Sequence, residues 1–443
     1  MRLTLRPAIV AMMLGAVAAI RLLAAEPPAV RAAALRPQVE VEAATALPDL
    51  EPLYRHFHAH PELSLQEEAT AARVADELDR LGFAVTRRVG GHGVVGVLTN
   101  GSGPTVLVRT DLDALPLVEQ TGAPYASATT GVMHACGHDL HMTVFLGTAR
   151  VLSRLKAQWR GTLLMIGQPA EEKVQGARAM LADGLYTRFP RPDYCVALHC
   201  NAELPAGQVG VTEGYALANV NSVDILVRGV GGHGASPHKT KDPIVLSAQI
   251  ILALQTIVSR ETDPTQPAVV TVGSIHGGTK HNIIPDDVRL QLTLRSYSAE
   301  VREHTIAAIR RIVRGLAEAA GLPEDRQPVV TVADESAEAT YNDPALAERL
   351  RAVFRDWLGA ERVVVTKPTI GAEDFGLFGR VEPAIPSCMF WLGTVDPERF
   401  AAHARTGAPL PALHSSQFLP AIEPTLQTGV IAMSGTVLEL MGR

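Results

Sequence analysis

The sequence predicts an α/β protein in which a mixed sheet flanked by helices carries a smaller, inserted α+β domain. Short apolar segments with strand patterns are interspersed with helical patterns before residue 215, and again after residue 333. Between these parts the composition changes near Ala216, and the expected elements follow a β-α-β-β-α order of their own. We therefore expect one large domain in two parts, 49–215 and 333–443, with residues 216–332 inserted between them.

Size and charge limit the class of protein. The chain has 443 residues, of which 47% are hydrophobic and 19% charged, which is enough for a large core. The formal net charge of −6 and the scattered basic residues argue against a nucleic-acid-binding protein. Four cysteines do not form a disulfide scaffold in a chain of this length. Cys195 and Cys200 are close enough to be joined in an oxidising compartment, whereas Cys388 is expected to be a small buried residue.

The N-terminus has the layout of a secretory signal peptide. Arg2 and Arg6 precede an apolar run over residues 8–20, and small residues follow. We expect a signal peptide over residues 1–25 and export to the periplasm or secretion. Because Arg21 interrupts the run, an uncleaved membrane anchor is the alternative. No later stretch has the uninterrupted apolar length of a membrane span.

The first part of the large domain is expected to begin after a Pro- and Ala-rich linker over residues 26–48. Asp49 is expected to cap a short helix that Pro61 ends. Ser64 to Glu67 have the pattern of a capping box that opens the next helix. The expected helices are 50–57, 64–81 and 143–155, and the expected strands are 83–89, 93–98, 105–109, 161–167 and 193–199.

Three of these strands end in groups that can bind metals. The first leads to Asp111 and Asp113, the next to Glu171 and Glu172, and the third to His199. In open α/β sheets, functional sites are built where strands end. Core packing alone does not explain this coincidence, so the sequence predicts a site at this edge of the sheet.

The inserted domain and the second part of the large domain follow the same patterns. A Gly-rich loop over residues 229–238 separates the first strand and helix of the insertion. The expected strands of the insertion are 222–228, 268–275, 289–297 and 329–332, with helices 243–260 and 300–320. The large domain is expected to resume with helix 344–357, strands 362–365 and 387–393, and a last helix 424–441.

Residues 133–141 are the centre of the predicted site. Cys136 and His138 lie on either side of a glycine, and both residue types bind Zn²⁺, while imidazole also suits Mn²⁺, Co²⁺ and Ni²⁺. Each candidate ligand alone could be a satisfied core or cap residue, but together they indicate a two-metal site. Of two adjacent carboxylates, one can bind a metal while the other acts as general base. The further candidates are Glu171, Glu172, His199 and His414.

Eight motifs resemble a single amidohydrolase family. It contains hippurate hydrolases, N-acyl-amino-acid amidohydrolases and plant auxin-conjugate hydrolases, within the aminoacylase/glutamate-carboxypeptidase superfamily of metallopeptidases. The match runs in order from about residue 50 to about residue 435. The motifs are His-x-His-Pro-Glu-Leu (58–63), Arg-Thr-Asp-Leu-Asp-Ala-Leu-Pro (109–116), His-Ala-Cys-Gly-His-Asp (134–139), Gln-Pro-Ala-Glu-Glu (168–172), Leu-His (198–199), Gly-His-Gly-Ala-x-Pro-His (232–238), Asn-Ile-Ile-Pro-Asp (282–286) and Leu-His-Ser (413–415).

The resemblance implies roles for particular residues. Two divalent ions per subunit, Zn²⁺ or Mn²⁺ with Co²⁺ or Ni²⁺ as alternatives, would be bound with Cys136 as the bridge and Glu171 as general base. His233 resembles the histidine that stabilises the oxyanion, which a dimer partner often supplies in relatives. Asn282 and Arg295 resemble residues that hold the substrate's free carboxylate. The implied metal ligands are Cys136, His138, Glu172, His199 and His414, with Asp113 orienting a ligand imidazole.

The resemblance also implies a fold and an activity. The large domain would be metallopeptidase-like, and the insertion would be a ferredoxin-like lid and dimerisation domain of a homodimer. The implied reaction cleaves N-acyl amino acids, such as hippurate-like conjugates, to a carboxylic acid and a free amino acid. A metallo-dipeptidase or carboxypeptidase acting on short peptides is the alternative. A non-catalytic metal- or peptide-binding protein is the other, and Glu171 beside a ligand glutamate argues against it. Glu373 and Asp374 also match a family motif and are expected to be structural.

Overall fold

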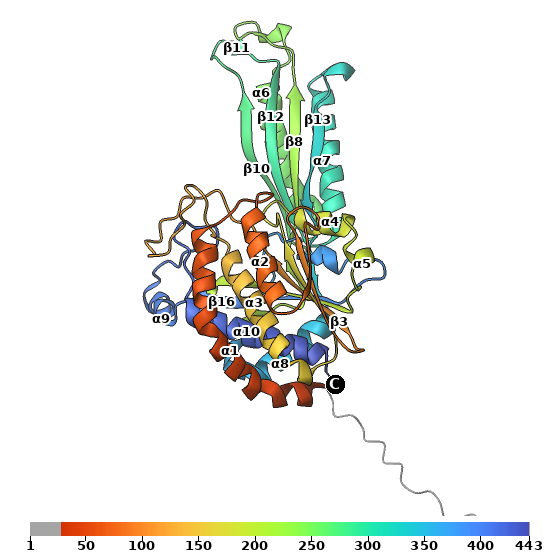
Figure 1. Cartoon of the computed structure of the whole chain (residues 1–443). Coiled ribbons are helices and arrows are strands. Elements are labelled where there is room, and N and C mark those ends of the chain that lie inside the picture. The colour runs from red at the N-terminus through yellow and green to blue at the C-terminus, as the bar shows by residue number, and fades with distance from the viewer. Residues whose placement is uncertain (1–27, 443) are drawn as a thin grey trace, which may run out of the picture.

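The structure is a computed structural model that describes residues 28–442, and it has two parts (Figure 1). A broad α/β domain forms the lower part of Figure 1, and a narrow sheet with two helices extends from its upper side. The C-terminus lies on the large domain, at the end farthest from the narrow part. The predicted signal peptide, 1–25, lies outside the described residues.

The large domain is built on an eight-stranded mixed sheet with the order β1-β2-β4-β3-β5-β16-β6-β15. The four strands β4, β3, β5 and β16 pair in parallel, and antiparallel pairs flank them on both sides. This is the mixed sheet that the sequence predicts. The strands are β1 Ala84–Arg87, β2 Val94–Asn100, β3 Thr105–Asp111, β4 Gly161–Gln168, β5 Tyr194–Pro205, β6 Val209–Val211, β15 Val363–Val365 and β16 Ser387–Val395.

Helices cover both faces of this sheet, because the strands are apolar on both sides. One buried cluster joins the sheet to α1, α2, α3, α8 and α10, and a second cluster joins its other face to α4 and α5. The helices are α1 Pro28–Ala59, α2 Glu68–Arg80, α3 His138–Arg154, α4 Gly176–Ala182, α5 Leu185–Arg188, α8 Pro344–Leu358, α9 Pro397–Thr406 and α10 Ile422–Leu440.

Helix α1 corrects the prediction for the start of the domain. The sequence analysis places a linker over 26–48 and a short helix over 50–57, but one helix runs from Pro28 to Ala59. Its three internal prolines, at 37, 48 and 52, lie on the exposed side. Buried residues recur every three or four positions, at 39, 43, 46, 50, 53 and 57, and pack into the core with α3 and α10. Burial of this stripe outweighs the hydrogen bonds that the prolines remove.

The predicted capping box of the second helix is wrong. Helix α2 begins at Glu68, and its N-cap residue Glu67 makes no capping hydrogen bond; the carboxylate of Glu62 accepts from the backbone N–H groups of Ala69 and Thr70 instead. The Ser64 hydroxyl instead donates to Oδ2 of Asp113, 2.6 Å away. Oε1 of Glu67 accepts from the backbone N–H groups of Leu65 and Ala170. The side chains of Ser64 and Glu67 therefore form hydrogen bonds near the candidate site and not at the end of the helix.

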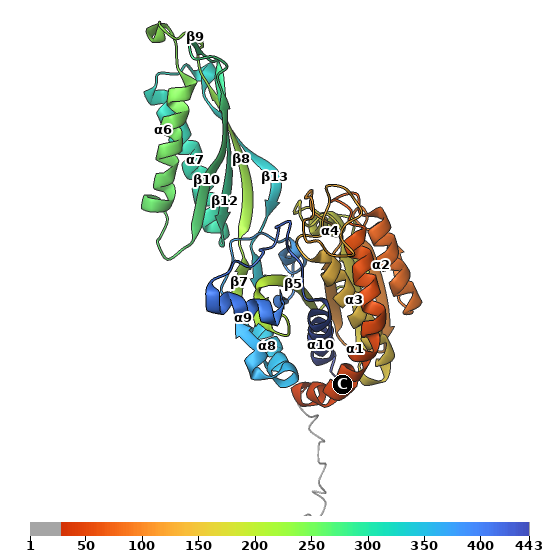
Figure 2. The same ribbon diagram turned by 90° about the vertical axis from the view of Figure 1, so that its left-hand side faces the viewer.

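The inserted domain has the predicted β-α-β-β-α order. Its sheet has the order β10-β12-β8-β13, and α6 and α7 pack on one face of it (Figure 2). A small pair, β9 Gly232–His233 and β11 Ile283–Ile284, lies at the tip farthest from the large domain. The other elements are β8 Asn219–Arg228, α6 Pro243–Thr256, β10 Ala268–Gly277, β12 Asp287–Ser296, α7 Ala299–Ala319 and β13 Val329–Ala337, with β7 Gly214–Leu217 paired to β14 Thr340–Asn342 at the base.

One described helical segment, Pro243–Glu261, is long and apolar enough to cross a membrane by length and composition alone. It comprises α6 and the π-helical turn that follows. Leu246, Ile250 and Leu254 on its inner face are buried in the core of the inserted domain. Such a helix is weak evidence for a membrane span, because core helices have the same composition.

The four cysteines are free and buried, so Cys195 and Cys200 form no disulfide in this structure. Both lie on strand β5, five positions apart, where side chains alternate between faces. Cys195 belongs to the core on one face of the sheet, and Cys200 to the core on the other. Cys388 is fully buried in β16, as the sequence predicts.

Candidate active site

The predicted metal ligands converge on Cys136. Its Sγ lies 3.5 Å from Nε2 of His199 and 3.3 Å from Nε2 of His414. The Cys136 thiol belongs to two groups of possible ligand atoms, and within each group all the atoms lie within 4.8 Å of one another. The first group contains the thiol, His138 and His199, and the second contains the thiol, Glu172 and His414. Because the sulfur belongs to both groups, it has the position of a bridging ligand.

Unusual backbone conformations aim these side chains. Gly137 has φ 84° before the first turn of α3, and a Cβ there would lie 2.7 Å from Sγ of Cys200. Glycine is therefore required between Cys136 and His138. His414 has φ 64°, and Ala170 and Val174, on either side of the glutamate pair, have φ near 50°. Backbone strain of this kind clusters at functional sites, where surrounding structure maintains it.

Hydrogen bonds to backbone carbonyls occupy Nδ1 of His138 and of His199 and leave Nε2 of each on the side of the cluster. The Nδ1–H of His138 donates to the carbonyl of Asp113, and that of His199 to the carbonyl of Cys200, each at 2.8 Å. Nε2 of His138 and Oε1 of Glu172 are buried and have no hydrogen-bond partner among residues 28–442. Buried polar atoms are almost always satisfied, so these atoms fit a group that binds there, such as a pair of divalent ions.

The protonation states of two candidate ligands, His199 and His414, also fit metal binding. Burial lowers the pKa of His199 well below its usual value. Burial and then the charge on His138 lower the pKa of His414. Both imidazoles are therefore neutral near pH 7, as metal ligands must be. Burial raises the pKa of the Cys136 thiol, so an ion that binds there would displace its proton.

Asp113 supports two of these groups. Its carbonyl orients His138, and Oδ2 of its carboxylate accepts from the backbone N–H of Glu172 at 3.0 Å. The neighbouring His141 donates from Nδ1 to Asp111, while its Nε2 accepts from the backbone N–H of Cys200. Since both nitrogens of His141 are used, this residue is a positioning group and not a ligand. It ties α3 to strand β5 beside His199.

His199 corrects one detail of the sequence analysis, which places it at the end of a strand. Strand β5 continues through His199 to Pro205. Its ring packs edge-on against that of Trp391 on the adjacent strand β16, with the ring centres 5.6 Å apart. This candidate ligand is therefore held inside the sheet rather than at a strand end.

Glu171 lies beside the ligand cluster in an acidic, buried setting. Its Oε2 is 3.8 Å from Nε2 of His138. Burial, and next the carboxylates of Glu373 and Glu172, raise the pKa of Glu171 well above its usual value. A carboxylate with a raised pKa can take and return a proton near neutral pH, as a general base must.

A buried network behind Glu171 was not recognised from the sequence. The Arg109 guanidinium binds Asp111 at 2.7 Å, Glu373 at 2.8 Å and Asp374 at 3.5 Å. Gln168 joins Arg109 to Asp374. The predicted structural role of Glu373 and Asp374 agrees with these contacts. An arginine that ends a strand beside two aspartates was the available signal for it.

Two cavities meet at the ligand cluster, and both are lined by Cys136, His199 and His414. The first, of about 370 Å³, also contains Glu171 and Glu172 together with Lys173 and Arg295, and we call it the cationic cavity. The second, of about 450 Å³, we call the apolar cavity; its walls include Ala202, Leu217, Trp391, Ala412 and Leu413, with Asn201 and Glu203.

Two predicted site residues lie elsewhere in the same chain. His233 is exposed on β9, at the tip of the inserted domain. Asn282 precedes β11, and its carbonyl accepts from the N–H of Gly234 at 2.8 Å, so it lies at the same tip. Asn282 and Arg295 therefore lie apart within one chain, and their shared role in holding the substrate's carboxylate stays a prediction.

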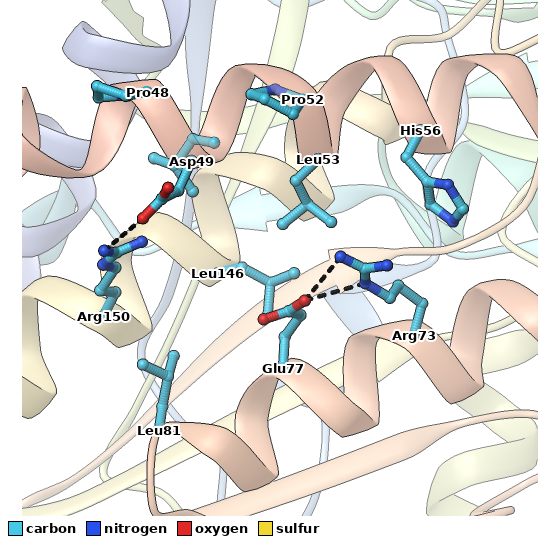
Figure 3. Close-up of a pocket in the computed structure, with 11 residues that line it drawn as sticks. Pro48, Asp49, Pro52, Leu53, His56, Arg73, Glu77, Leu81, Leu146 and Arg150 are labelled. Atoms are coloured by element: carbon cyan, nitrogen blue, oxygen red, sulfur yellow. Dashed lines mark hydrogen bonds and ion pairs between the residues drawn. The ribbon is translucent and has the colours of Figure 1, made fainter.

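A third cavity, of about 500 Å³, lies between α1, α2 and α3 and differs from the site (Figure 3). Its charged groups already neutralise one another. Arg73 pairs with Glu77 at 2.9 Å, and Arg150 pairs with Asp49 at 2.6 Å. It therefore lacks the unsatisfied buried atoms that distinguish the Cys136 cluster.

Buried His58 gives a testable pH dependence. Its Nδ1 lies 2.7 Å from Asp139 and its Nε2 3.2 Å from Glu119. Burial opposes the charge, but these carboxylates raise the pKa of His58 from 6.5 to about 9. The charged form thus stabilises the fold fully below about pH 6.5, and this contribution is lost as the pH rises through about 9. We expect the unfolding free energy difference between wild type and His58→Gln to shrink by about 3 kcal/mol from about pH 6 to about pH 10.

Urea unfolding of the metal-free proteins at several pH values measures this difference. The exposed His304 provides the matched control, because it has one distant carboxylate, 3.9 Å away, instead of two close ones. His304→Gln is expected to show little change with pH. A constant difference for His58→Gln would contradict a charged His58.

The fold and the convergent ligands together define a metal-dependent hydrolase that acts on amide bonds. The chain belongs to peptidase family M20/M25/M40, whose model matches residues 107–407. It is 37% identical over 335 residues to a hippurate hydrolase of Campylobacter jejuni, covering 74% of this chain and 85% of that protein. It is 36% identical over 388 residues to thermostable carboxypeptidase 2 of Saccharolobus solfataricus, covering 85% and 92%.

A solved structure agrees with this assignment. The crystal structure of a dinuclear metal-binding M20 peptidase from Bacillus subtilis matches with a TM-score of 0.73 and 28% identity, covering 90% of this chain and 99% of that one. The family and the metallopeptidase-like fold predicted from the motifs are thus confirmed, as is the class of metal-dependent enzyme.

Proposed function

We propose that this enzyme hydrolyses N-acyl amino acids to a carboxylic acid and a free amino acid. This proposal rests on the observation that Arg295 and Lys173 line the same cavity as Glu171 and the ligand cluster. Arg295 is half-buried, and its guanidinium forms no ion pair with any described residue. A guanidinium placed this way fits a free carboxylate next to the scissile amide.

The residues of the chain divide the work of the reaction. When bound, two divalent ions supply Lewis acidity, which polarises the amide carbonyl and acidifies water. Glu171 accepts the proton of the water whose oxygen forms the new bond to the carbonyl carbon. As the carbon–nitrogen bond breaks, Glu171 returns that proton to the leaving amine. Cys136, His138, Glu172, His199 and His414 would hold the ions, and this set of sulfur, nitrogen and oxygen ligands suits Zn²⁺ or Mn²⁺, with Co²⁺ or Ni²⁺ as alternatives.

Hydrolysis of N-benzoylglycine tests the proposal. We expect release of glycine when the protein is supplied with Zn²⁺, Mn²⁺, Co²⁺ or Ni²⁺, and loss of at least about 100-fold in rate after chelation. Restoring the ion should restore the rate. Absence of hydrolysis of every N-acyl amino acid tried, with ions bound, would contradict the proposal.

A carboxypeptidase or dipeptidase activity is the second candidate, supported by the similarity to a carboxypeptidase. The Arg295 guanidinium would equally bind the C-terminal carboxylate of a peptide. The two candidates differ in the other half of the substrate, because a dipeptide carries an α-ammonium group there. Values of kcat/KM for N-benzoylglycine and for phenylalanylglycine separate them.

The tip of the inserted domain supports a homodimer. His233 and Asn282 lie there, away from the ligands of their own chain, and a partner's tip could bring both to the site. The outer face of the Pro243–Glu261 segment exposes Ile244, Val245 and Leu252, which a second copy would cover. If each site uses the partner's His233, mixing the inactive Glu171→Gln and His233→Ala proteins should restore activity, because one site of a mixed dimer then has both residues intact. No restoration, or a monomer in sedimentation, would contradict it.

We also propose that the protein is exported to the periplasm or secreted, on the strength of residues 1–25. N-terminal sequencing of the protein from a cell fractionation tests this. A chain that retains Met1 in the cytosolic fraction would contradict export.

A further inference from the structure

The apolar and cationic cavities give the two halves of a substrate different surroundings. An amide held at Cys136, His199 and His414 can extend into both, because these residues line both. Lys173 and Arg295 line only the cationic cavity, and no lysine or arginine is among the described residues that line the apolar one. The free carboxylate of the substrate therefore fits the cationic cavity, which leaves the apolar cavity for the acyl half.

The walls of the apolar cavity suit an extended apolar group. Leu217, Trp391 and Leu413 line it, and Trp391 is itself fixed against the ring of His199. Apolar walls favour apolar groups in proportion to the surface that they remove from water. With about 450 Å³, the cavity has room for an acyl group well beyond acetyl.

Among the described residues that line this cavity, Glu203 is the one with an acidic side chain. Glu203 lies near the end of strand β5, where the pairing with β16 is irregular, and its side chain is exposed; Cys200, Asn201 and Ala202 before it line the same cavity. Glu203 is four residues beyond His199, which at about 3.3 Å per residue limits their separation along the strand to about 13 Å. Its N–H donates to Oδ1 of Asn201, and its carboxylate forms no ion pair with any residue of the described chain.

Building on the proposed function, we infer that the apolar cavity receives the acyl half and that Glu203 gives it a charge preference. Neutral acyl groups, or groups with a positive distal end, are accepted, and acyl groups with a distal carboxylate are disfavoured. The carboxylate of Glu203 repels a second carboxylate that enters the same cavity. At separations of several ångströms near a protein surface, this repulsion lowers kcat/KM by a factor of about ten. The substrate class is thus narrower than N-acyl amino acids as a whole.

Three glycine conjugates of similar length test this inference: hexanoylglycine, 5-aminopentanoylglycine and adipoylglycine, which end in a methyl, an ammonium and a carboxylate group. For the metal-loaded wild type, we expect kcat/KM for hexanoylglycine to exceed that for adipoylglycine by about tenfold. In Glu203→Gln the two values should come within about threefold of each other, and in Glu203→Lys adipoylglycine should be preferred over 5-aminopentanoylglycine.

Glu68→Gln is the matched control, because Glu68 is an exposed carboxylate on α2 and pairs only with exposed Arg88. It should keep the wild-type ratios. Equal hydrolysis of adipoylglycine and hexanoylglycine by the wild type, or unchanged ratios in Glu203→Lys, would overturn the inference and leave the proposed function standing. Hydrolysis of none of the three, with ions bound, would overturn both.

Discussion

Glu171→Gln is expected to abolish turnover while leaving the metal centre intact. The change keeps the size of the side chain but removes its capacity to accept a proton, so kcat should fall by at least about 100-fold. Glu171 belongs to neither of the two ligand groups that share Cys136, so the content of bound ions should stay at the wild-type value. Elemental analysis of the purified proteins and assay of N-benzoylglycine hydrolysis measure the two quantities.

The comparison between adjacent glutamates sharpens this test. Glu172→Gln changes the same atoms one residue later, but Glu172 belongs to a ligand group. It should lower ion content as well as rate, whereas Glu171→Gln lowers only the rate. Near-normal turnover in Glu171→Gln would rule out its role as general base, and loss of ions would mark it as a ligand.

Cys136→Ala is expected to weaken both metal positions at once. Since the sulfur belongs to both groups of ligand atoms, its removal takes one ligand from each, and ion content should fall well below that of wild type. The rise in unfolding free energy on adding ions, about 4 kcal/mol at a thousandfold excess over Kd, should shrink accordingly. Elemental analysis after gel filtration and urea unfolding with and without ions check both effects.

The buried thiol of Cys388 provides the control for this substitution. It lies in the core of β16, away from the ligand atoms, so Cys388→Ala removes a sulfur without touching the site. Its ion content should equal that of wild type. If Cys136→Ala also kept a full complement of ions, the bridging position of this sulfur would be wrong.

The site could be predicted from the sequence where the candidate ligands have metal-binding side chains in recognisable motifs. Cys136, His138 and Glu172 lie in compact motifs, and the strand pattern brings their segments to one edge of the sheet. His414 is among the candidates, but it is distant in sequence from the others and no local pattern predicts that it lies beside Cys136. Its left-handed backbone, which aims it at the sulfur, leaves no trace in composition.

Errors in the predicted fold arose where tertiary contacts override local rules. Residues 26–48 are predicted to be a Pro- and Ala-rich linker, but the prolines of α1 lie on the exposed side of a helix that the core stabilises from its other side. Ser64 and Glu67 have the spacing of a capping box, yet the carboxylate of Asp113 and the backbone of Ala170 compete for them. The spacing of residues in the sequence identifies possible hydrogen bonds, but it does not show which of them form in the folded protein.

Arg295 and Glu171 belong to different parts of the chain, and this separation has a consequence for substrate length. Arg295 lies on β12 of the insertion, whereas Glu171 follows β4 of the large sheet. The chain passes between these two bodies at residues 217–219 and again at 337–340. If Arg295 anchors the substrate's carboxylate, as proposed, the distance from this anchor to the reacting amide depends on the angle between the two bodies, and a change of that angle would let amino acids of different length bind without a change in either surface.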